Sequence, residues 1–68
     1  MKIALNGNQV ALDDHATVAD AVAAAGHERG TFGVAVAVNG EVVPRSSWAE
    51  TVLEDADKVE VLVASQGG

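Results

Sequence analysis

The sequence contains no cysteine and no tyrosine, and it has only one proline, one tryptophan and one phenylalanine. Without cysteine, the chain cannot form a disulfide, an iron–sulfur cluster or a thiolate zinc site. A chain of 68 residues buries only about 60% of the surface that it exposes when unfolded. Domains of this size often need a disulfide or a bound metal for stability. The fold must therefore come from the packing of apolar side chains, of which alanine and valine are the most frequent.

Positive charge is also scarce, since four Lys and Arg residues stand against ten Asp and Glu residues, for a net charge of −6. Binding to phosphates requires a basic face, so we do not expect a nucleic acid as partner. A basic protein surface fits this charge better, because complementary charge speeds the encounter. The longest apolar run, residues 33–38, is too short to span a bilayer. No signal-peptide pattern is present, and we expect a cytoplasmic protein with no membrane partner.

The side chains that carry chemistry are few and scattered. His15 and His27 lie in different loops, and their separation matches no metal-ligand spacing. No motif places a histidine beside Ser46, Ser47 or Ser65, and the glycines form no phosphate-binding loop. We therefore predict no catalytic side chain and no metal site.

Two Asn-Gly pairs, Asn6-Gly7 and Asn39-Gly40, each lie between short apolar runs. This pair favours a type I′ turn, which needs positive φ at both central residues and joins two antiparallel strands. The pattern predicts two hairpins and a final strand, with strands at residues 2–5, 9–12, 32–38, 41–43 and 58–64.

One short helix is predicted between the hairpins. Thr17 can cap it, with Asp20 three residues later as in a capping box. Gly26 suits the position after the last helical residue. The apolar stripe recurs at helical spacing and consists of Val18, Val22 and Ala25.

A second helical turn is predicted at residues 47–50, with Ser47 as its cap and Glu50 reaching back. Trp48 is expected to cover one end of the sheet from a satellite cluster. Val52 and Leu53 are expected to return to the core, which should also hold the helical stripe together with Ile3, Leu5 and the alternate valines of the strands, Val34, Val36, Val38, Val59, Val61 and Val63.

The C-terminal tail Ser65-Gln66-Gly67-Gly68 has no periodicity and follows the last strand directly. A terminal carboxylate reacts poorly until it is activated, for example as an acyl-adenylate. Two glycines have no side chain to obstruct a narrow enzyme channel. Four extended residues reach at most about 14 Å, enough to deliver Gly68 into a pocket while the domain docks outside. We predict one folded α+β domain at residues 1–64 and a flexible tail at 65–68.

The whole chain resembles the ThiS family of thiamine-biosynthesis sulfur carriers. The resemblance rests on the segment VNGEVVPRSSW at residues 38–48, on Asp57-Lys58-Val59-Glu60 before the last strand, and on Gly67-Gly68. It implies an α+β ubiquitin-like β-grasp fold, with a mixed sheet of four to five strands packed on one helix. One departure is Ala56, where the family usually has glycine. If the backbone takes positive φ there, alanine is strained.

The resemblance also implies a mechanism in which the chain is a protein co-substrate and not an enzyme. An adenylating, E1-like enzyme would use ATP to activate the Gly68 carboxylate, and Gly67 and Gly68 would be recognised as the tail. A sulfur donor enzyme would supply the sulfur of a thiocarboxylate, which thiazole synthase would transfer to the thiazole ring of thiamine. The chain itself would hold no bound cofactor.

The sheet face away from the helix is predicted to dock these enzymes, because exposed apolar patches mark interaction sites. Leu62 and Val43 are expected to be its anchors, being the bulkiest residues. Lys2, Glu60 and Ala35 are placed on the same face. The predicted partner interface consists of Ala4, Ala37, Val43, Leu62 and Ala64.

Three alternatives remain open at this point. A carrier for molybdenum-cofactor (molybdopterin) synthesis would share the fold and the tail. A ubiquitin-like modifier would join Gly68 to lysines of other proteins. A plain binding module would not need Gly67 and Gly68 at all, so their deletion would leave its function intact.

Overall fold

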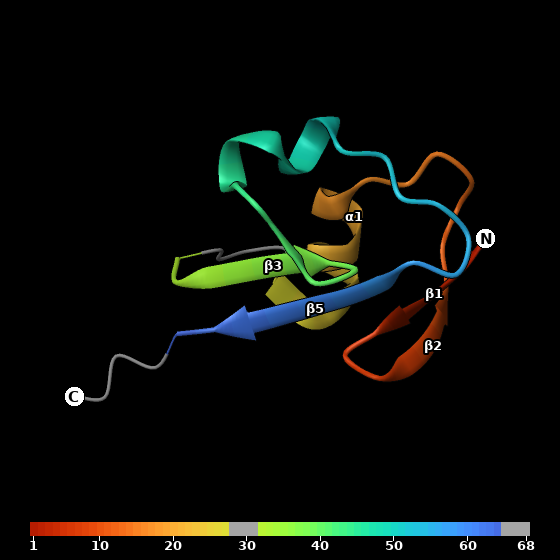
Figure 1. Ribbon diagram of the computed structural model, residues 1–68, viewed down its shortest axis with the longest axis horizontal. Coiled ribbons are helices and arrows are strands. Elements are labelled where there is room, and N and C mark those ends of the chain that lie inside the picture. The colour runs from red at the N-terminus through yellow and green to blue at the C-terminus, as the bar shows by residue number, and fades with distance from the viewer. Residues whose placement is uncertain (28–31, 65–68) are drawn as a thin grey trace.

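The computed structural model of the protein describes residues 1–27 and 32–64. Along the chain, two strands precede a helical segment and three follow it (Figure 1). The elements are β1 (Lys2–Leu5), β2 (Asn8–Ala11), the α-helix α1 (Val18–Val22), the π-helical turn η1 (Ala23–His27), β3 (Val34–Val38), β4 (Glu41–Val43), the 3-10 helix η2 (Arg45–Glu50) and β5 (Lys58–Val63).

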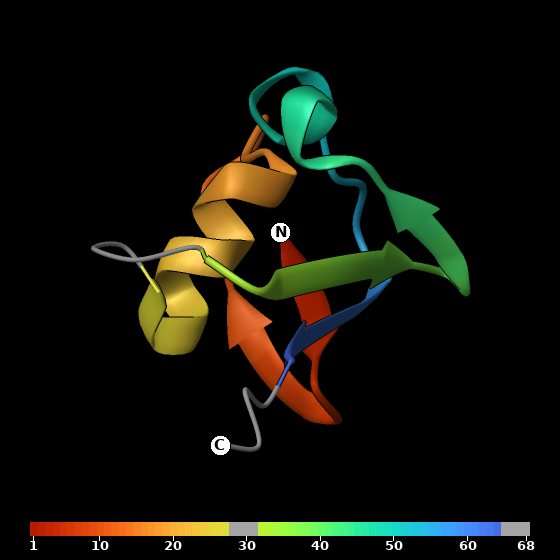
Figure 2. The same cartoon turned by 90° about the vertical axis from the view of Figure 1, so that its left-hand side faces the viewer.

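The five strands form one mixed sheet in the order β2-β1-β5-β3-β4. The central strand β5 runs parallel to β1 and antiparallel to β3, and both hairpins are antiparallel. The helical segment covers one face of this sheet, and η2 closes the space above them (Figure 2). The predicted α+β ubiquitin-like β-grasp architecture is therefore confirmed.

Both Asn-Gly pairs adopt the backbone that the sequence predicts. The φ angles are 49° and 84° at Asn6 and Gly7, and 51° and 83° at Asn39 and Gly40. These positive values at both central residues are those of type I′ turns, whose twist matches the twist of the strands that they join.

The helix begins at the predicted cap. The Thr17 amide donates to Asp20 Oδ2 at 2.8 Å, and the Asp20 amide donates to Thr17 Oγ1 at 3.4 Å, so the capping box is complete. Gly26 has a φ of 97°, which ends the helical geometry as predicted. The regular α-helical part is short, and its stability must come from packing on the sheet.

The predicted cap of the second helical turn is wrong. The 3-10 helix η2 begins at Arg45, Pro44 precedes it, and no side chain caps it. The Ser47 amide instead donates to the Pro44 carbonyl at 2.8 Å, the i to i+3 bond of a 3-10 turn. Pro44 holds a φ of −60° and starts the turn before Ser47, so the Ser47 amide is already occupied inside it.

The core lies between the sheet, α1 and η2, and it holds most of the predicted residues. The prediction is wrong for Val63 and Val52, which are 53% and 54% exposed and do not belong to the core. Val63 is the last residue of β5, whose end extends beyond α1 (Figure 1). Val52 is exposed between the half-buried Thr51 and the buried Leu53. Trp48 belongs to the main core at 5% exposure, not to a satellite cluster. The buried cluster is Ile3, Leu5, Val18, Ala21, Val22, Val36, Trp48, Leu53, Val59 and Val61.

Candidate functional site

The candidate site is the C-terminal end of β5 together with the sheet face that α1 leaves uncovered. Central strand β5 ends at Val63, and the next residue, Ala64, donates its amide to the Gly33 carbonyl at 2.8 Å. Gly67 and Gly68, the predicted reactive tail, lie outside the described residues. The structure therefore defines the point from which the tail starts.

Two asparagines hold β5 in place from the hairpin turns. The Asn6 side chain accepts from the Val61 amide at 2.8 Å and donates to the Val61 carbonyl at 3.1 Å. It takes the place of a backbone amide and prolongs the pairing of β1 with β5. From the other side, Asn39 Oδ1 accepts from the Lys58 amide at 2.9 Å. Side-chain hydrogen bonds at Lys58 and Val61 therefore hold β5, the strand that leads to the tail.

The turn before β5 is built around Asp57 and Ala56. Asp57 Oδ2 accepts from the Glu54 amide at 2.8 Å, and its Oδ1 accepts from Asn39 Nδ2 at 3.0 Å. Ala56 has a φ of 73°, a conformation that suits glycine and strains alanine. The departure from the family pattern therefore falls on a residue whose backbone is in the left-handed region.

The outer face of the sheet follows from the strand pairing, since directly paired residues point to the same side. Ala37 pairs with Glu60 on β5 and with Val42 on β4. The neighbouring pair joins Val43 to Val36, which is buried in the core. The placement of Val43 on the outer face is therefore wrong, because Val43 packs against the core and Val42 lies outside.

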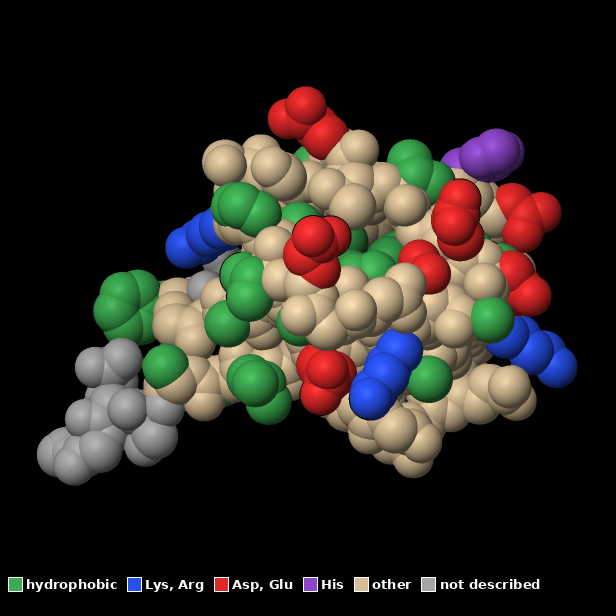
Figure 3. Space-filling model, in the orientation of Figure 1, with side chains coloured by type: hydrophobic (Ala, Val, Ile, Leu, Met, Phe, Trp, Pro, Cys, Tyr) green, Lys and Arg blue, Asp and Glu red, His purple; other side chains and the backbone are tan. Residues whose placement is uncertain are grey.

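The uncovered face carries an outer apolar patch. Leu62 is 65% exposed and Val42 is 72% exposed. Figure 3 shows hydrophobic side chains gathered on this face toward the end where β5 finishes, with acidic side chains mainly above and to the right. We define the outer apolar patch as Ala35, Ala37, Val42 and Leu62.

The other predicted interface residues lie around this patch. Ala64 is exposed directly after β5. Ala4 is half-buried on the outer face, but it pairs with Lys58 and Gln9, so its surroundings are polar. Lys2 is exposed on the same side of β1. The apolar part of the face therefore lies over β3, β4 and the end of β5, with Glu60 beside Ala37, and the polar part lies over β1, β2 and the start of β5.

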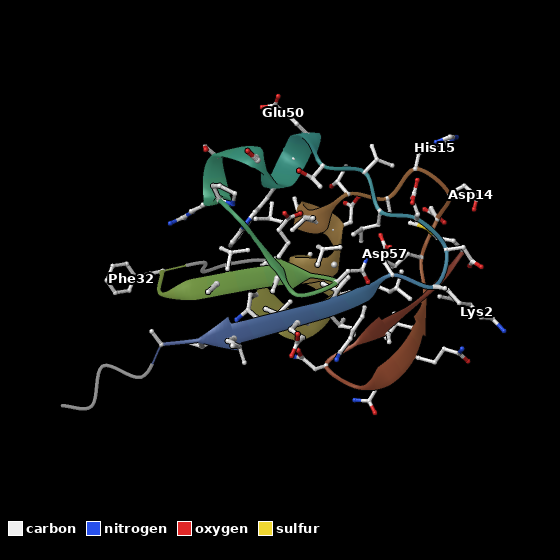
Figure 4. All side chains as sticks on the ribbon, in the orientation of Figure 1. Lys2, Asp14, His15, Phe32, Glu50 and Asp57 are labelled. Atoms are coloured by element: carbon white, nitrogen blue, oxygen red, sulfur yellow. The ribbon has the colours of Figure 1, made fainter. Side chains whose placement is uncertain are left out.

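Sequence reasoning missed Val42 and Phe32. The register of the two-residue Asn-Gly turn pairs Val43 with Val36 and so places Val42 outside, a signal that was present in the sequence. Phe32 was expected at the start of a strand, but it precedes β3 and is 78% exposed. It lies at the end of the molecule where β5 finishes (Figure 4).

No cluster of His, Cys, Asp or Glu among residues 1–27 and 32–64 could hold a metal ion. The same residues enclose no pocket. His15 is exposed, in a turn where its φ is 74°. No helix within these ranges is long and apolar enough to cross a membrane.

The fold, with its central strand leading into the last residues of the chain, defines a ubiquitin-like β-grasp protein. The model of the ThiS family matches residues 3–68. The crystal structure of a thiamine biosynthesis protein (ThiS) from Geobacter metallireducens is similar at a TM-score of 0.76 and 30% sequence identity, with all of both chains covered. No curated protein matches the chain in sequence. The chain belongs to the ThiS family, whose members are small sulfur carriers that work with partner enzymes in thiamine biosynthesis.

Proposed function

We propose that this chain carries sulfur for thiazole formation as a thiocarboxylate on Gly68. The Gly68 carboxylate attacks the α-phosphate of ATP on an adenylating enzyme, and pyrophosphate leaves. A hydrosulfide equivalent from a sulfur donor enzyme then attacks the acyl carbon. The bond to AMP breaks, one carboxylate oxygen departs with AMP, and a thiocarboxylate remains. The carrier supplies no catalytic side chain and holds no cofactor, since ATP belongs to the activating enzyme.

The observation that carries this proposal is the extent of the family match, which runs through the final Gly67-Gly68. The fold supports it, because the backbone is hydrogen-bonded along β5 and at Ala64, and only four residues of the chain follow Ala64. Those four residues span at most about 14 Å when extended, so Gly68 has to enter an enzyme pocket that lies close to the docked domain. We place this ATP-dependent chemistry in the cytoplasm.

The outer apolar patch is the surface that we propose for the adenylating enzyme and for thiazole synthase. Leu62 remains an anchor, and Val42 takes the place that Val43 held in the prediction, because Val42 is the exposed member of the pair. Ala37 and Ala64 lie beside them, and Ala4 marks the polar margin. Exposed apolar side chains on a flat sheet face fit a protein partner better than a small molecule.

The test exploits the missing cysteines. The chain is incubated with ATP, an adenylating enzyme and sulfide, treated with a thiol alkylating reagent, and fragmented in the mass spectrometer. We expect one alkyl adduct on Gly68, because the thiocarboxylate sulfur is the only thiol-like nucleophile that a chain without cysteine can acquire. Fragmentation is needed, since exchange of oxygen for sulfur has nearly the mass change of Met1 oxidation.

A chain that lacks Gly67-Gly68 is the control and should acquire no adduct. Absence of an adduct on the full chain, with an enzyme shown to be active on another carrier, would contradict the proposal. Higher-mass conjugates to lysines in the same mixture would instead indicate a ubiquitin-like modifier. Transfer of the sulfur to molybdopterin in place of the thiazole would indicate the other carrier class.

A further inference from the structure

The start of the tail is fastened by one hydrogen bond outside the regular strands. The Ala64 amide donates to the Gly33 carbonyl at 2.8 Å. This bond continues the pairing of β3 with β5 beyond their last regular pair, Val34 with Val63. It is therefore the last described backbone hydrogen bond before the four C-terminal residues.

The backbone of Gly33 makes this hydrogen bond in a conformation that other residues avoid. Its φ is +76°. A Cβ added to Gly33 would lie 3.5 Å from the Ala64 carbonyl oxygen and 3.9 Å from the Ala64 Cβ, which are ordinary contact distances. Space would therefore admit a side chain, and the left-handed φ is what favours glycine here. A β-branched residue is the least compatible with this angle.

We infer that Gly33 is a positioning residue that fixes the start of the tail at Ala64 and so sets how far Gly68 reaches into the activating enzyme. The inference rests on the proposed function. With Ala64 held, the four residues that follow it span at most about 14 Å. Without the hydrogen bond between Ala64 and Gly33, the last paired residue is Val63, and the five residues that follow it span at most about 17 Å.

A longer segment after the last backbone hydrogen bond places the carboxylate less accurately at the reacting phosphate. Binding of the domain depends on the outer apolar patch, which does not include Gly33. Breaking the hydrogen bond should therefore lower kcat for adenylation while KM for the carrier stays near its wild-type value. A merely structural role for Gly33 would not lower kcat while it leaves KM for the carrier unchanged.

The experiment compares Gly33→Val with Gly33→Asn in pyrophosphate release by an enzyme that adenylates the wild-type chain. Asparagine tolerates positive φ, as Asn6 and Asn39 do in this protein at 49° and 51°. We expect Gly33→Val to lose about tenfold in kcat and Gly33→Asn to remain close to wild type. Amide hydrogen exchange at Ala64 should accelerate in Gly33→Val alone.

Gly26→Val is the matched control. Gly26 has a φ of +97° and open space around its Cβ position, so valine meets the same backbone penalty at another site. If Gly26→Val lowers kcat as much as Gly33→Val does, or if Gly33→Val keeps its kcat, the inference is overturned. Failure of the wild-type chain to be adenylated would instead overturn the proposed function itself.

Discussion

At Ala56 the chain keeps a side chain where its backbone has a φ of 73°. The turn needs this angle because the Ala56 amide donates to the Lys2 carbonyl at 2.7 Å, and the following Asp57 organises the entry into β5. A left-handed conformation costs a residue with a Cβ about 1 kcal/mol relative to glycine. The hydrogen bonds of the turn must therefore offset a local strain.

The first prediction is that Ala56→Gly stabilises the protein by about 0.5–1 kcal/mol, since removal of the Cβ relieves the strain. Ala56 is exposed, so the loss of its methyl group removes little buried apolar area. Urea denaturation followed by circular dichroism measures it. Ala49→Gly is the control, because Ala49 is also exposed but has no positive φ, and this change should destabilise. A decrease in stability in Ala56→Gly would show that the turn carries no such strain.

At the scale of the element, β5 is the strand on which the fold and the candidate site both depend. It pairs with β1 through only two residue pairs, Ala4 with Lys58 and Leu5 with Val59. The Asn6 side chain extends this short parallel pairing to Val61. One hairpin turn residue therefore serves two purposes, reversing the chain and bonding the central strand.

The second prediction separates these two purposes. Asn6→Gly keeps positive φ accessible but removes two side-chain hydrogen bonds, and it should cost about 1–3 kcal/mol of unfolding free energy. Asn39→Gly makes the same change in the other turn, where the side-chain bonds are exposed, so its cost should be smaller. Chemical denaturation of both variants gives the comparison. Equal costs would mean that the part-buried bonds of Asn6 contribute no more than the exposed bonds of Asn39.

At the scale of the whole molecule, the two faces of the sheet have different tasks. One face holds the core against α1 and η2, and the other presents the outer apolar patch beside the end of β5 (Figure 3). Two adjacent residues of β4 point to these opposite faces, since Val43 packs on the core and Val42 is 72% exposed.

The third prediction uses that boundary. Val42→Glu and Leu62→Glu should leave the fold intact but weaken binding to the adenylating enzyme by more than about 1 kcal/mol, because a charge replaces an apolar anchor. Val43→Glu should instead destabilise the protein by about 2 kcal/mol or more, since it brings a carboxylate against the core. Calorimetric titration and thermal unfolding measure the two effects.

The contrast between the β4 variants contains its own control. If Val42→Glu unfolds the protein and Val43→Glu does not, the register of β4 is incorrect. If Val42→Glu and Leu62→Glu both fold and bind with unchanged affinity, the outer apolar patch is not the docking surface.

Local features of the sequence by themselves determined both hairpin turns, the capping box at Thr17, the helix end at Gly26 and the order of the elements. Each depends on a few adjacent residues, such as the positive φ of Asn-Gly, and needs no distant partner. Adjacent residues, Gly67-Gly68, also suggested a tail that presents a carboxylate for activation, whereas the sulfur chemistry was implied by the resemblance of the whole chain to the ThiS family.

Only the tertiary structure decided that Trp48 enters the main core and that Val63 stays exposed. Alternation alone does not orient the two adjacent valines of the three-residue strand β4, but the register set by the Asn39-Gly40 turn pairs Val43 with Val36 and was available in the sequence. Burial of Trp48 and exposure of Val63 depend on where η2 and α1 lie over the sheet. These are contacts between residues far apart in the chain, which no local pattern contains.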